Sequence, residues 1–476
     1  MFTLRPIPHG RSTRPSTLAS ARICIGCGLA TAAVGTAGLV EGLEPFRTYF
    51  YAFVWWGWIA VASGWTRLLG RPAILLDRFR GFVALTVWSV PFWLAFELIN
   101  VVLRNWYYVG AMPTRPERML GMVVCFATVL PGVLATRDWL DALGLFRNLR
   151  CRPWPVNRSF ALACTIAGVL FLALPLWKPE RFYPLVWGST VLLGEAWLVR
   201  RGRRGLLTTL AEGDPRPALQ LLVAGFVTGG LWESWNYHAG AKWIYTVPGF
   251  EELKLFEMPV LGFFGFPPFA LECWSFACVL AATGLAPSFE FDRDTENESD
   301  PNPETRSSTS GTETPGPQRL PLAGLVVALV ISAPMMWLTD ERTVRETRPL
   351  VSELEQADAQ LIAELGRLGI EDVAALRRHL VLGRPSPVDA FGPHQRRALF
   401  DEIELLSTAG LGVRGRAWLA AADVHDVEAL SELDWTVVCE LDPVAGYGPA
   451  PYDREVRYWI RSAKKRIERG ELLTAD

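Results

Sequence analysis

Long apolar stretches alternate with short charged loops along the first two thirds of the chain. A membrane-spanning helix needs about 20 predominantly apolar residues, within a range of roughly 17 to 25, to cross the hydrocarbon core. Nine stretches meet this requirement: 23–42, 48–64, 82–102, 119–136, 159–176, 183–199, 218–235, 258–286 and 321–338. The pattern predicts an all-α fold, a polytopic membrane helix bundle.

The pattern changes abruptly after residue 286. Residues 287–319 are rich in Ser, Thr, Pro, Asp and Glu, which cannot bury enough apolar surface to fold, and they are predicted to be a disordered linker. One further span, 320–338, precedes a charged tail at 345–476. Apolar residues recur there at helical spacing, so we expect a small soluble helical domain that begins with an amphipathic helix. These residues are Val351, Leu354, Leu361, Leu365 and Leu368.

Composition and charge narrow the class of protein to which the chain can belong. With 50% hydrophobic and only 20% charged residues, the chain is too apolar for an ordinary soluble protein. A net charge of -2 gives no reason to expect a nucleic-acid partner. Cys24 and Cys27 have CxxC spacing, but they lie inside an apolar helix without a second pair, so we interpret them as small core residues.

Arginines mark the sides of the membrane. They follow the second, fourth and sixth predicted helices, and the positive-inside rule makes those loops and the N-terminal arm, 1–20, cytoplasmic. These arginines are Arg67, Arg71, Arg78 and Arg80, then Arg137, Arg147, Arg150, Arg152 and Arg158, then Arg200, Arg201, Arg203 and Arg204. We therefore expect a multi-pass protein of the cell inner membrane, with the loops after helices three and seven outside. If all nine spans cross, the tail is outside too.

The two halves of the membrane region repeat each other. "FELINVVLRNWYY" at 96–108 aligns with "WESWNYHAGAKWIY" at 232–245. The matched pairs are Glu97 with Glu233, Asn100 with Asn236, Trp106 with Trp243, Trp55 with Trp187, Trp65 with Trp197, Gly70 with Gly202 and Pro131 with Pro268. Two four-helix units, 21–145 and 158–286, follow from this. An even number of spans per unit predicts parallel units, related by an axis along the membrane normal, with a cleft between them.

Acidic residues inside spans are the strongest functional signal. A charged residue at the centre of a span costs about 2.5 to 3.5 kcal/mol on insertion scales, so it normally faces the bundle interior or water and carries a function. The candidates are Glu97, Glu233, Glu257 and Glu272. Asn100 and Asn236 follow two of them by three residues and share their helix faces, where an amide can fix the protonation and rotamer of a carboxylate. The alternative is that Glu and Asn cap or bridge helices while Trp and Tyr form an aromatic belt. Recurrence in both halves favours function.

A second signal lies in "FEMPVLGFFGFPPFALE", 256–272. Its prolines break the helical hydrogen-bond ladder, so this span should be interrupted and line a cavity. Candidate substrate-binding residues are Trp106, Tyr107, Trp243, Tyr245, Phe263, Phe266 and Glu272. A cavity with carboxylates and π faces suits an apolar polyene or isoprenoid, because a glutamic acid can protonate a double bond and aromatic faces stabilise the carbocation.

The stretch 232–257 resembles the membrane-bound lycopene cyclase domain family. The residues that carry the resemblance are Glu233, Asn236, Trp243, Tyr245, Val247, Pro248, Glu251 and Glu252. The resemblance implies non-redox, isomerising cyclisation of a carotenoid end group by proton donation. Here two residues separate Pro248 from the glutamate pair, the first half lacks that pair, and each unit has four spans where the family commonly has three.

The tail resembles helix-hairpin-helix domains. In "AGLGVRGRAWLAAADVHDVEALSEL", 409–433, Gly410 and Gly412 occupy the Gly-x-Gly turn, and 365–380 echoes its second half. In DNA-binding members such turns hold a phosphate. Acidic residues are mixed with Arg throughout this tail, so nucleic acid is an unlikely partner and a protein partner is favoured.

Three hypotheses remain open. Only His238 lies near the spans, and there is no GxGxxG beside a strand, no P-loop and no GxSxG, so we predict no metal and no cofactor. The first hypothesis is an enzyme acting on an isoprenoid or another membrane lipid, with Glu233 or Glu257 as acid and Asn236 orienting it. The second is a carrier or channel lined by Glu97 and Glu233. The third is a non-catalytic anchor that presents the tail.

Overall fold

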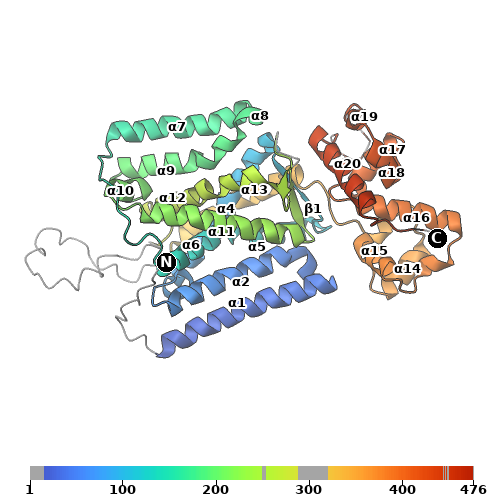
Figure 1. Ribbon diagram of the computed structural model, residues 1–476, viewed down its shortest axis with the longest axis horizontal. Coiled ribbons are helices and arrows are strands. Elements are labelled where there is room, and N and C mark those ends of the chain that lie inside the picture. The colour runs from blue at the N-terminus through green and yellow to red at the C-terminus, as the bar shows by residue number, and fades with distance from the viewer. Residues whose placement is uncertain are drawn as a thin grey trace, which may run out of the picture.

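The computed structural model describes residues 15–248, 253–287, 320–442, 444, 446, 447 and 450–474. The predicted linker and the Glu251–Glu252 pair lie outside the described residues, as does most of the N-terminal arm. The described chain is helical, with four short strands. This confirms the predicted all-α bundle with a helical C-terminal region (Figure 1).

The first half of the membrane region contains α1 (Pro15–Glu41), α2 (Phe46–Leu68), α3 (Ile74–Asp77), α4 (Phe79–Leu103), α5 (Arg115–Phe126) and α6 (Val129–Ala142). Its first helix begins before the predicted boundary at residue 21. The fourth predicted span is divided between α5 and α6, and Pro131 is the third residue of α6. A proline there needs no intrahelical partner for its nitrogen, so it is tolerated in the first turn.

The second half follows the same order. Its elements are α7 (Arg158–Trp177), α8 (Pro179–Phe182), η1 (Tyr183–Gly188), α9 (Ser189–Arg200), α10 (Leu206–Ala211), α11 (Arg216–His238), η2 (Val260–Gly265) and α12 (Phe266–Ala282). The span at 258–286 is interrupted as predicted, because a 3-10 segment precedes α12. Pro268 is the third residue of α12, the place that Pro131 has in α6. Gly225 and Gly229 of α11 face Phe266 so closely that a Cβ atom would clash, which lets the two helices pack tightly.

Seven helical stretches in the described chain are long and apolar enough to cross a membrane. They are Leu18–Glu41, Phe79–Leu103, Arg115–Ala142, Arg158–Trp177, Pro179–Arg200, Val260–Ala282 and Leu322–Thr343, the last lying in α13. Their number and composition are those of a multi-pass membrane protein. The other two predicted spans form α2 and α11, helices of 23 residues each that fall outside this group. Polar residues of α11, including Gln220 and Glu233, are buried inside the bundle.

A small antiparallel strand pair joins the two halves, and the sequence did not predict it. Strand β1 (Trp106–Val109) follows α4, and β2 (Lys242–Tyr245) follows α11. A second pair joins β3 (Lys254–Leu255) to β4 (Met258–Pro259). Both helices therefore deliver a strand to the same end of the bundle.

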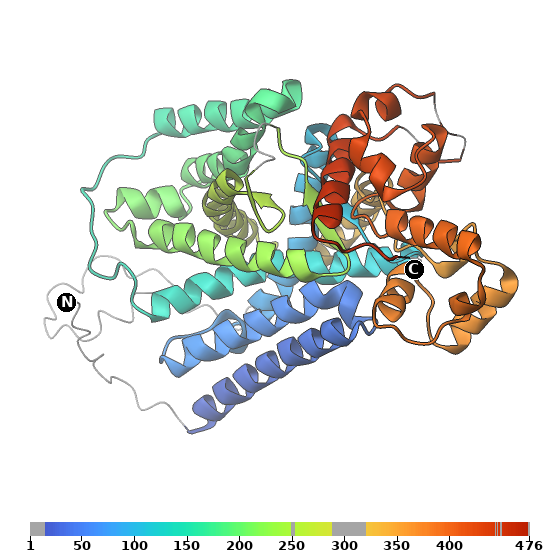
Figure 2. The ribbon, with the colours of Figure 1, turned by 45° about the vertical axis from the view of Figure 1, so that its right-hand side comes forward.

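The C-terminal region packs around two apolar cores. Its helices are α14 (Ala359–Arg367), α15 (Val373–Val381), α16 (Pro393–Leu406), α17 (Gly412–Ala421), α18 (Val427–Glu432), α19 (Trp435–Cys439) and α20 (Asp453–Glu468). One core includes Leu365 and Leu376, and the other includes Trp418 and Trp459. The first α-helix here starts only at Ala359, where Asp358 caps it, so the helix predicted from residue 351 is shorter than expected. Figures 1 and 2 place this region beyond the β1–β2 end of the bundle.

The turn before α17 adopts a left-handed backbone conformation at its two glycines. Gly410 and Gly412 have φ values of 82° and 57°, the left-handed region that favours glycine. The echo between 365–380 and 409–433 also has a structural counterpart. Asp372 and Asp426 lie at matching places and cap α15 and α18, each accepting a hydrogen bond from a backbone N–H three residues on.

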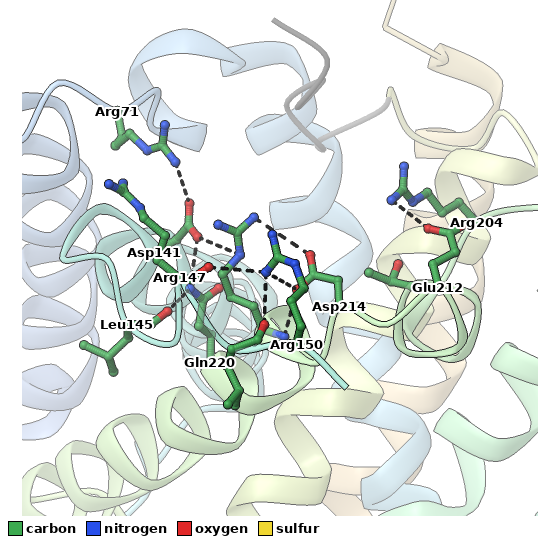
Figure 3. A network of polar contacts seen from close by, with 12 residues as sticks. Arg71, Asp141, Leu145, Arg147, Arg150, Arg204, Glu212, Asp214 and Gln220 are labelled. Carbon is green, nitrogen blue, oxygen red and sulfur yellow. Dashed lines mark hydrogen bonds and ion pairs between the residues drawn. The ribbon is translucent and has the colours of Figure 1, made fainter. Parts of the chain in front are cut away.

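A polar network closes the opposite end of the bundle (Figure 3). Gln220 of α11 donates to Asp141 over 3.0 Å and to the Leu145 carbonyl over 2.9 Å. Asp141 also forms ion pairs with Arg71 at 3.6 Å and Arg216 at 3.9 Å. Since Asp141 belongs to the first half and Gln220 to the second, these contacts tie the halves together at the end predicted to be cytoplasmic.

Candidate functional site

The β1–β2 pair places equivalent residues of the two halves opposite each other. Trp106 faces Tyr245, and Tyr108 faces Trp243. The sequence repeat matches Trp106 with Trp243, and therefore Tyr108 with Tyr245. The tryptophan of each half thus faces the tyrosine of the other half, as a two-fold relation between the halves requires.

Two asparagines hold these strands against their helices. The Asn100 side chain donates to the Trp106 carbonyl over 2.8 Å and accepts from the Asn105 N–H over 2.9 Å. Asn236 donates to the Trp243 carbonyl and accepts from the Trp243 N–H, each over 2.9 Å. Each amide therefore uses both its donor and its acceptor on strand backbone. Their observed hydrogen-bond partners are therefore backbone groups of the strands. From the sequence we expected the two amides to orient the carboxylates instead.

The two repeated glutamates lie under the strands and are fully buried. Oε1 of Glu97 accepts hydrogen bonds from Trp93 at 2.9 Å, Trp106 at 3.0 Å and the Tyr108 hydroxyl at 2.6 Å. Oε1 of Glu233 accepts from the Tyr245 hydroxyl at 2.8 Å. Within the described chain, the second oxygen of each carboxyl group has no hydrogen-bond partner.

No cation neutralises either glutamate within salt-bridge distance, as far as the described residues go. A buried, unpaired charge is costly, so a site of this kind holds the neutral carboxylic acid most easily. Hydrogen bonds to Oε1 remain possible in that state, because the carbonyl oxygen of the acid still accepts.

Both tyrosines stay protonated. Burial raises the pKa of the Tyr108 hydroxyl well above its usual value, and the neighbouring Glu97 raises it further. The pKa of Tyr245 is raised in the same way, first by burial and then by Glu233. Each hydroxyl therefore keeps its proton at physiological pH, and in this structure it donates to its carboxyl group.

Two aromatic cavities adjoin these glutamate–tyrosine pairs. The smaller, of about 470 Å³, is lined by Trp93, Trp106, Tyr108, Trp187, Trp232, Trp243, Tyr245, Met258, Gly262, Gly265, Phe266 and Phe269. The larger, of about 820 Å³, includes Tyr49, Tyr51, Met112, Met122, Cys125 and Phe126 in its wall. Trp93, Tyr108, Trp232 and Trp243 line both.

The carboxyl groups themselves are not part of either cavity wall. Instead of a cavity lined by these glutamates, there are two neighbouring cavities. The smaller is lined mainly by rings, and the larger by rings and aliphatic side chains together with Arg118 and Lys242. The Tyr108 and Tyr245 side chains stand between the cavities and the carboxyl groups. A proton from Glu97 or Glu233 can therefore reach a ligand only through a tyrosine hydroxyl or after a rearrangement.

The other predicted site residues are dispersed. Phe266 lines the smaller cavity, and Phe263 packs on it with ring centroids 5.8 Å apart. Glu272 is buried elsewhere in α12 and accepts from the Thr190 N–H over 3.1 Å. Glu257 lies above the sheet, where it pairs with Lys242 at 2.7 Å.

Tyr107 faces away from both cavities. Side chains alternate along a strand, so Trp106 and Tyr108 share one face while Tyr107 takes the other. There Tyr107 packs with Val109 and Ile244 against residues of the C-terminal region. The sequence choice of Tyr107 as a substrate-binding residue therefore falls on the wrong face of β1 for these cavities.

Several cavity residues were missed from the sequence. Trp93, Tyr108, Trp187, Trp232 and Phe269 line the smaller cavity without having been selected. Two signals could have found some of them: Trp93 precedes Glu97 by four residues, one helical turn, and Tyr108 matches Tyr245 in the repeat. Trp187 matches Trp55 in the repeat, and Phe269 lies within the 256–272 stretch predicted to line a cavity, so these two positions also carried a signal.

The C-terminal region closes the outer face of the sheet. Residues 344–348 run beside β1, with the Arg345 N–H donating to the Tyr108 carbonyl over 2.9 Å and the Arg348 N–H to the Ala111 carbonyl over 2.8 Å. Farther along, Tyr458 donates to Oε2 of Glu257 over 3.2 Å. Glu346 accepts from the Gly410 N–H over 3.0 Å, and burial raises the pKa of its carboxyl group to about 8.

Comparison of the chain with protein-family models, with curated proteins and with solved structures finds no match. In the described chain, no group of three or more His, Cys, Asp or Glu side chains is placed to hold a metal ion. The class that fold and site define is thus a multi-pass membrane bundle with paired carboxyl–tyrosine groups beside aromatic cavities.

Proposed function

We propose that the protein is a membrane enzyme that isomerises or cyclises an apolar isoprenoid or polyene by proton transfer. The Glu97–Tyr108 and Glu233–Tyr245 pairs are its acids. One observation carries the proposal: Tyr108 and Tyr245, whose hydroxyls bond to buried carboxyl groups, both belong to the wall of the smaller cavity, which otherwise consists mainly of aromatic rings.

The cavities support a ligand of this class. Small-molecule sites are concave and mostly apolar with a few placed polar groups, and the smaller cavity has this character. Their walls offer many π faces, including Trp93 and Trp232 with ring centroids 5.2 Å apart. Such faces attract a cation, which suits a reaction that passes through a carbocation.

The proposed reaction conserves atoms and electrons. In the reacting state the hydrogen bond is reversed: the carboxylic acid O–H donates to the phenolic oxygen, and the tyrosine O–H points to the ligand. The tyrosine then protonates one carbon of a C=C bond while the acid returns a proton to the phenolic oxygen. The other carbon becomes a cation, which a neighbouring double bond can attack to close a ring. Loss of a proton from an adjacent carbon to the carboxylate, back through the tyrosine, restores the acid. The product is an isomer of the substrate, and no redox partner takes part.

The structure gives the two alternatives less support. A carrier for ions needs polar groups along its path, whereas the smaller cavity is lined mainly by rings and neither glutamate is part of a cavity wall. A scaffold that merely presents its tail has no need to bury that tail against β1 and β2, where Ala409 and Tyr458 pack on Tyr107, Val109 and Ile244.

The test is production of an isomerised polyene in cells. The full chain is co-expressed with pathways that supply several acyclic polyenes, and products are separated by chromatography. Glu233→Gln and Tyr245→Phe should each lower product formation by roughly 100-fold or more, the usual contribution of general acid catalysis. Glu195→Gln is the matched control, since Glu195 is another buried membrane glutamate but accepts from the Leu207 N–H outside both cavities. Unchanged pigment with every polyene, or full activity in the Glu97→Gln/Glu233→Gln double variant, would contradict the proposal.

A further inference from the structure

A third cavity, of about 830 Å³, lies where the bundle and the C-terminal region meet. It is lined by Val102, Leu103, Arg104, Trp177, Lys178, Pro179, Glu180, Arg181 and Arg454. The first three come from the end of α4, the next five from the end of α7 and from α8, and the last from α20. Two candidate spans, Phe79–Leu103 and Arg158–Trp177, end at this cavity, which puts it at the level of the membrane surface.

The cavity carries an excess of positive charge. Arg104, Lys178, Arg181 and Arg454 line it together with a single acid, Glu180. In the part of the chain that the structure describes, none of the four cations forms an ion pair with a carboxylate. Four cations around one space repel one another unless an anion occupies it.

Contacts with neighbouring rings and backbone fix three of these side chains. The Arg104 guanidinium lies over the ring of Tyr452, 4.0 Å from its centroid, and Lys178 lies 4.5 Å from the centroid of Trp177. Arg454 donates to the Thr246 carbonyl. Because these contacts leave other N–H groups of the arginines available, the cations are held in place and can still bind a ligand.

One side of the cavity borders an apolar outer surface. α7 exposes a run of large apolar side chains that leads to the cavity, and in a membrane these face lipid. They are Leu162, Ile166, Val169, Leu170, Leu176 and Trp177. Trp177 is both part of the cavity wall and 67% exposed, as is common for Trp at a membrane interface.

We propose that this cavity binds the phosphate-bearing headgroup of an anionic phospholipid, with the acyl chains lying along α7. Arginine guanidinium groups bind phosphate through paired hydrogen bonds, which explains the residue type. The apolar surface beside the cavity favours a lipid over free phosphate. Because Arg454 belongs to α20, a bound headgroup also ties the C-terminal region to the bundle.

Lipid binding to the detergent-solubilised full chain tests the proposal. Phosphatidylglycerol, phosphatidylcholine and inorganic phosphate are titrated separately, with bound lipid counted by native mass spectrometry. Each basic residue near a membrane surface contributes a factor of about five, so the Lys178→Gln/Arg181→Gln double variant should bind phosphatidylglycerol about 25-fold more weakly. The control Arg200→Gln/Arg203→Gln loses the same charge at the other end of the bundle and should bind like the wild type.

Hydrogen exchange in α20 gives a second readout that does not depend on counting lipids. Phosphatidylglycerol should slow exchange at 453–468 in the wild type and in the control, and should have no effect in the Lys178→Gln/Arg181→Gln variant. Equal affinities in all three proteins, or equal binding of phosphatidylcholine, would overturn the proposal. Protection of α20 by inorganic phosphate alone, without further change when phosphatidylglycerol is added, would overturn the assignment to a lipid.

Discussion

The hydroxyl group of Tyr245 donates to Oε1 of Glu233 over 2.8 Å, and the equivalent bond from Tyr108 reaches Glu97 over 2.6 Å. The two bonds are alike, but their surroundings differ. Glu97 also accepts from the indoles of Trp93 and Trp106, whereas the indole nitrogen of Trp243 has no hydrogen-bond partner in the described chain. The two halves therefore share the same geometry, but Glu97 has more hydrogen-bond donors around it than Glu233.

This difference predicts unequal effects of removing the two hydroxyls. Tyr245→Phe takes away the hydroxyl donor of Glu233 and should lower the free energy of unfolding by about 1–3 kcal/mol. Tyr108→Phe leaves Glu97 with two indole donors and should cost only about 0.5–1.5 kcal/mol. Denaturant unfolding in detergent, followed by tryptophan fluorescence, compares them. A larger loss for Tyr108→Phe would contradict this view of the site.

The asparagine clamps predict a local loss of order in the strands. Asn236→Ala removes both the donor and the acceptor that hold Trp243, at a cost of about 1–3 kcal/mol for each buried backbone group left unpaired. Hydrogen exchange at 242–245 should become faster. Asn157→Ala is the control, because Asn157 caps α7 through the Phe160 N–H and should cost only about 1 kcal/mol. Unchanged exchange at β2 in Asn236→Ala would show that the clamp is dispensable.

The helices and the repeat could be predicted because their signals are local. Runs of apolar residues predict spans, and the repeat matched Pro131 with Pro268, each of which is the third residue of its helix, α6 or α12. The spacing of Glu97 and Asn100 also predicted that both residues share one face of α4, and from there both side chains contact β1. Function was harder to assign to Asn100, because an amide three residues from a carboxylate can serve either the carboxylate or the backbone.

The strands and the docked tail could not be predicted for a physical reason. Four residues are too few to show an alternating pattern, so nothing in "WYYV" distinguished Tyr108 from Tyr107 until β1 fixed which face each one takes. Tyr458 contacts Glu257 across 201 positions of sequence, and no periodicity carries information over that separation. Contacts of this kind depend on how whole elements pack.

A buried ion pair anchors the last span, α13, to the first half. Arg118 of α5 donates to both oxygens of Asp340, over 2.6 and 2.9 Å, and Asp340 is almost fully buried. Asp340 also pairs with Arg115 at 3.0 Å, so Asp340→Asn leaves the Arg118 charge without its carboxylate and Arg115 with Glu341 alone. This substitution should lower the free energy of unfolding by about 3–5 kcal/mol. Glu341→Gln is the neighbouring control, because Glu341 pairs with Arg115 at an exposed site and should cost at most about 1 kcal/mol. Equal effects in the two variants, measured by thermal unfolding, would contradict the anchoring role.

Glu346 should make docking of the C-terminal region depend on pH. Burial raises its pKa to about 8 in the docked state, compared with a usual value near 4.5. The docked state thus binds the proton more tightly than a state in which Glu346 is exposed to water. Its contribution to docking is complete below about pH 4.5 and is lost as the pH rises through about 8, at roughly 1.4 kcal/mol per pH unit.

Docking should therefore be tighter at pH 6 than at pH 9. Hydrogen exchange at 409–411, where the Gly410 N–H bonds to Glu346, measures it after correction for the intrinsic pH dependence of exchange. Glu346→Gln keeps an oxygen for that bond but cannot ionise, so its protection should stay level over this range. Lys242 of β2 is the charged group that acts on Glu346, where it lowers the pKa, and it is not replaced in either protein. If protection in the wild type falls no faster than in Glu346→Gln, ionisation of Glu346 does not govern docking, and the C-terminal region is held by its apolar contacts with Tyr107 and Ile244.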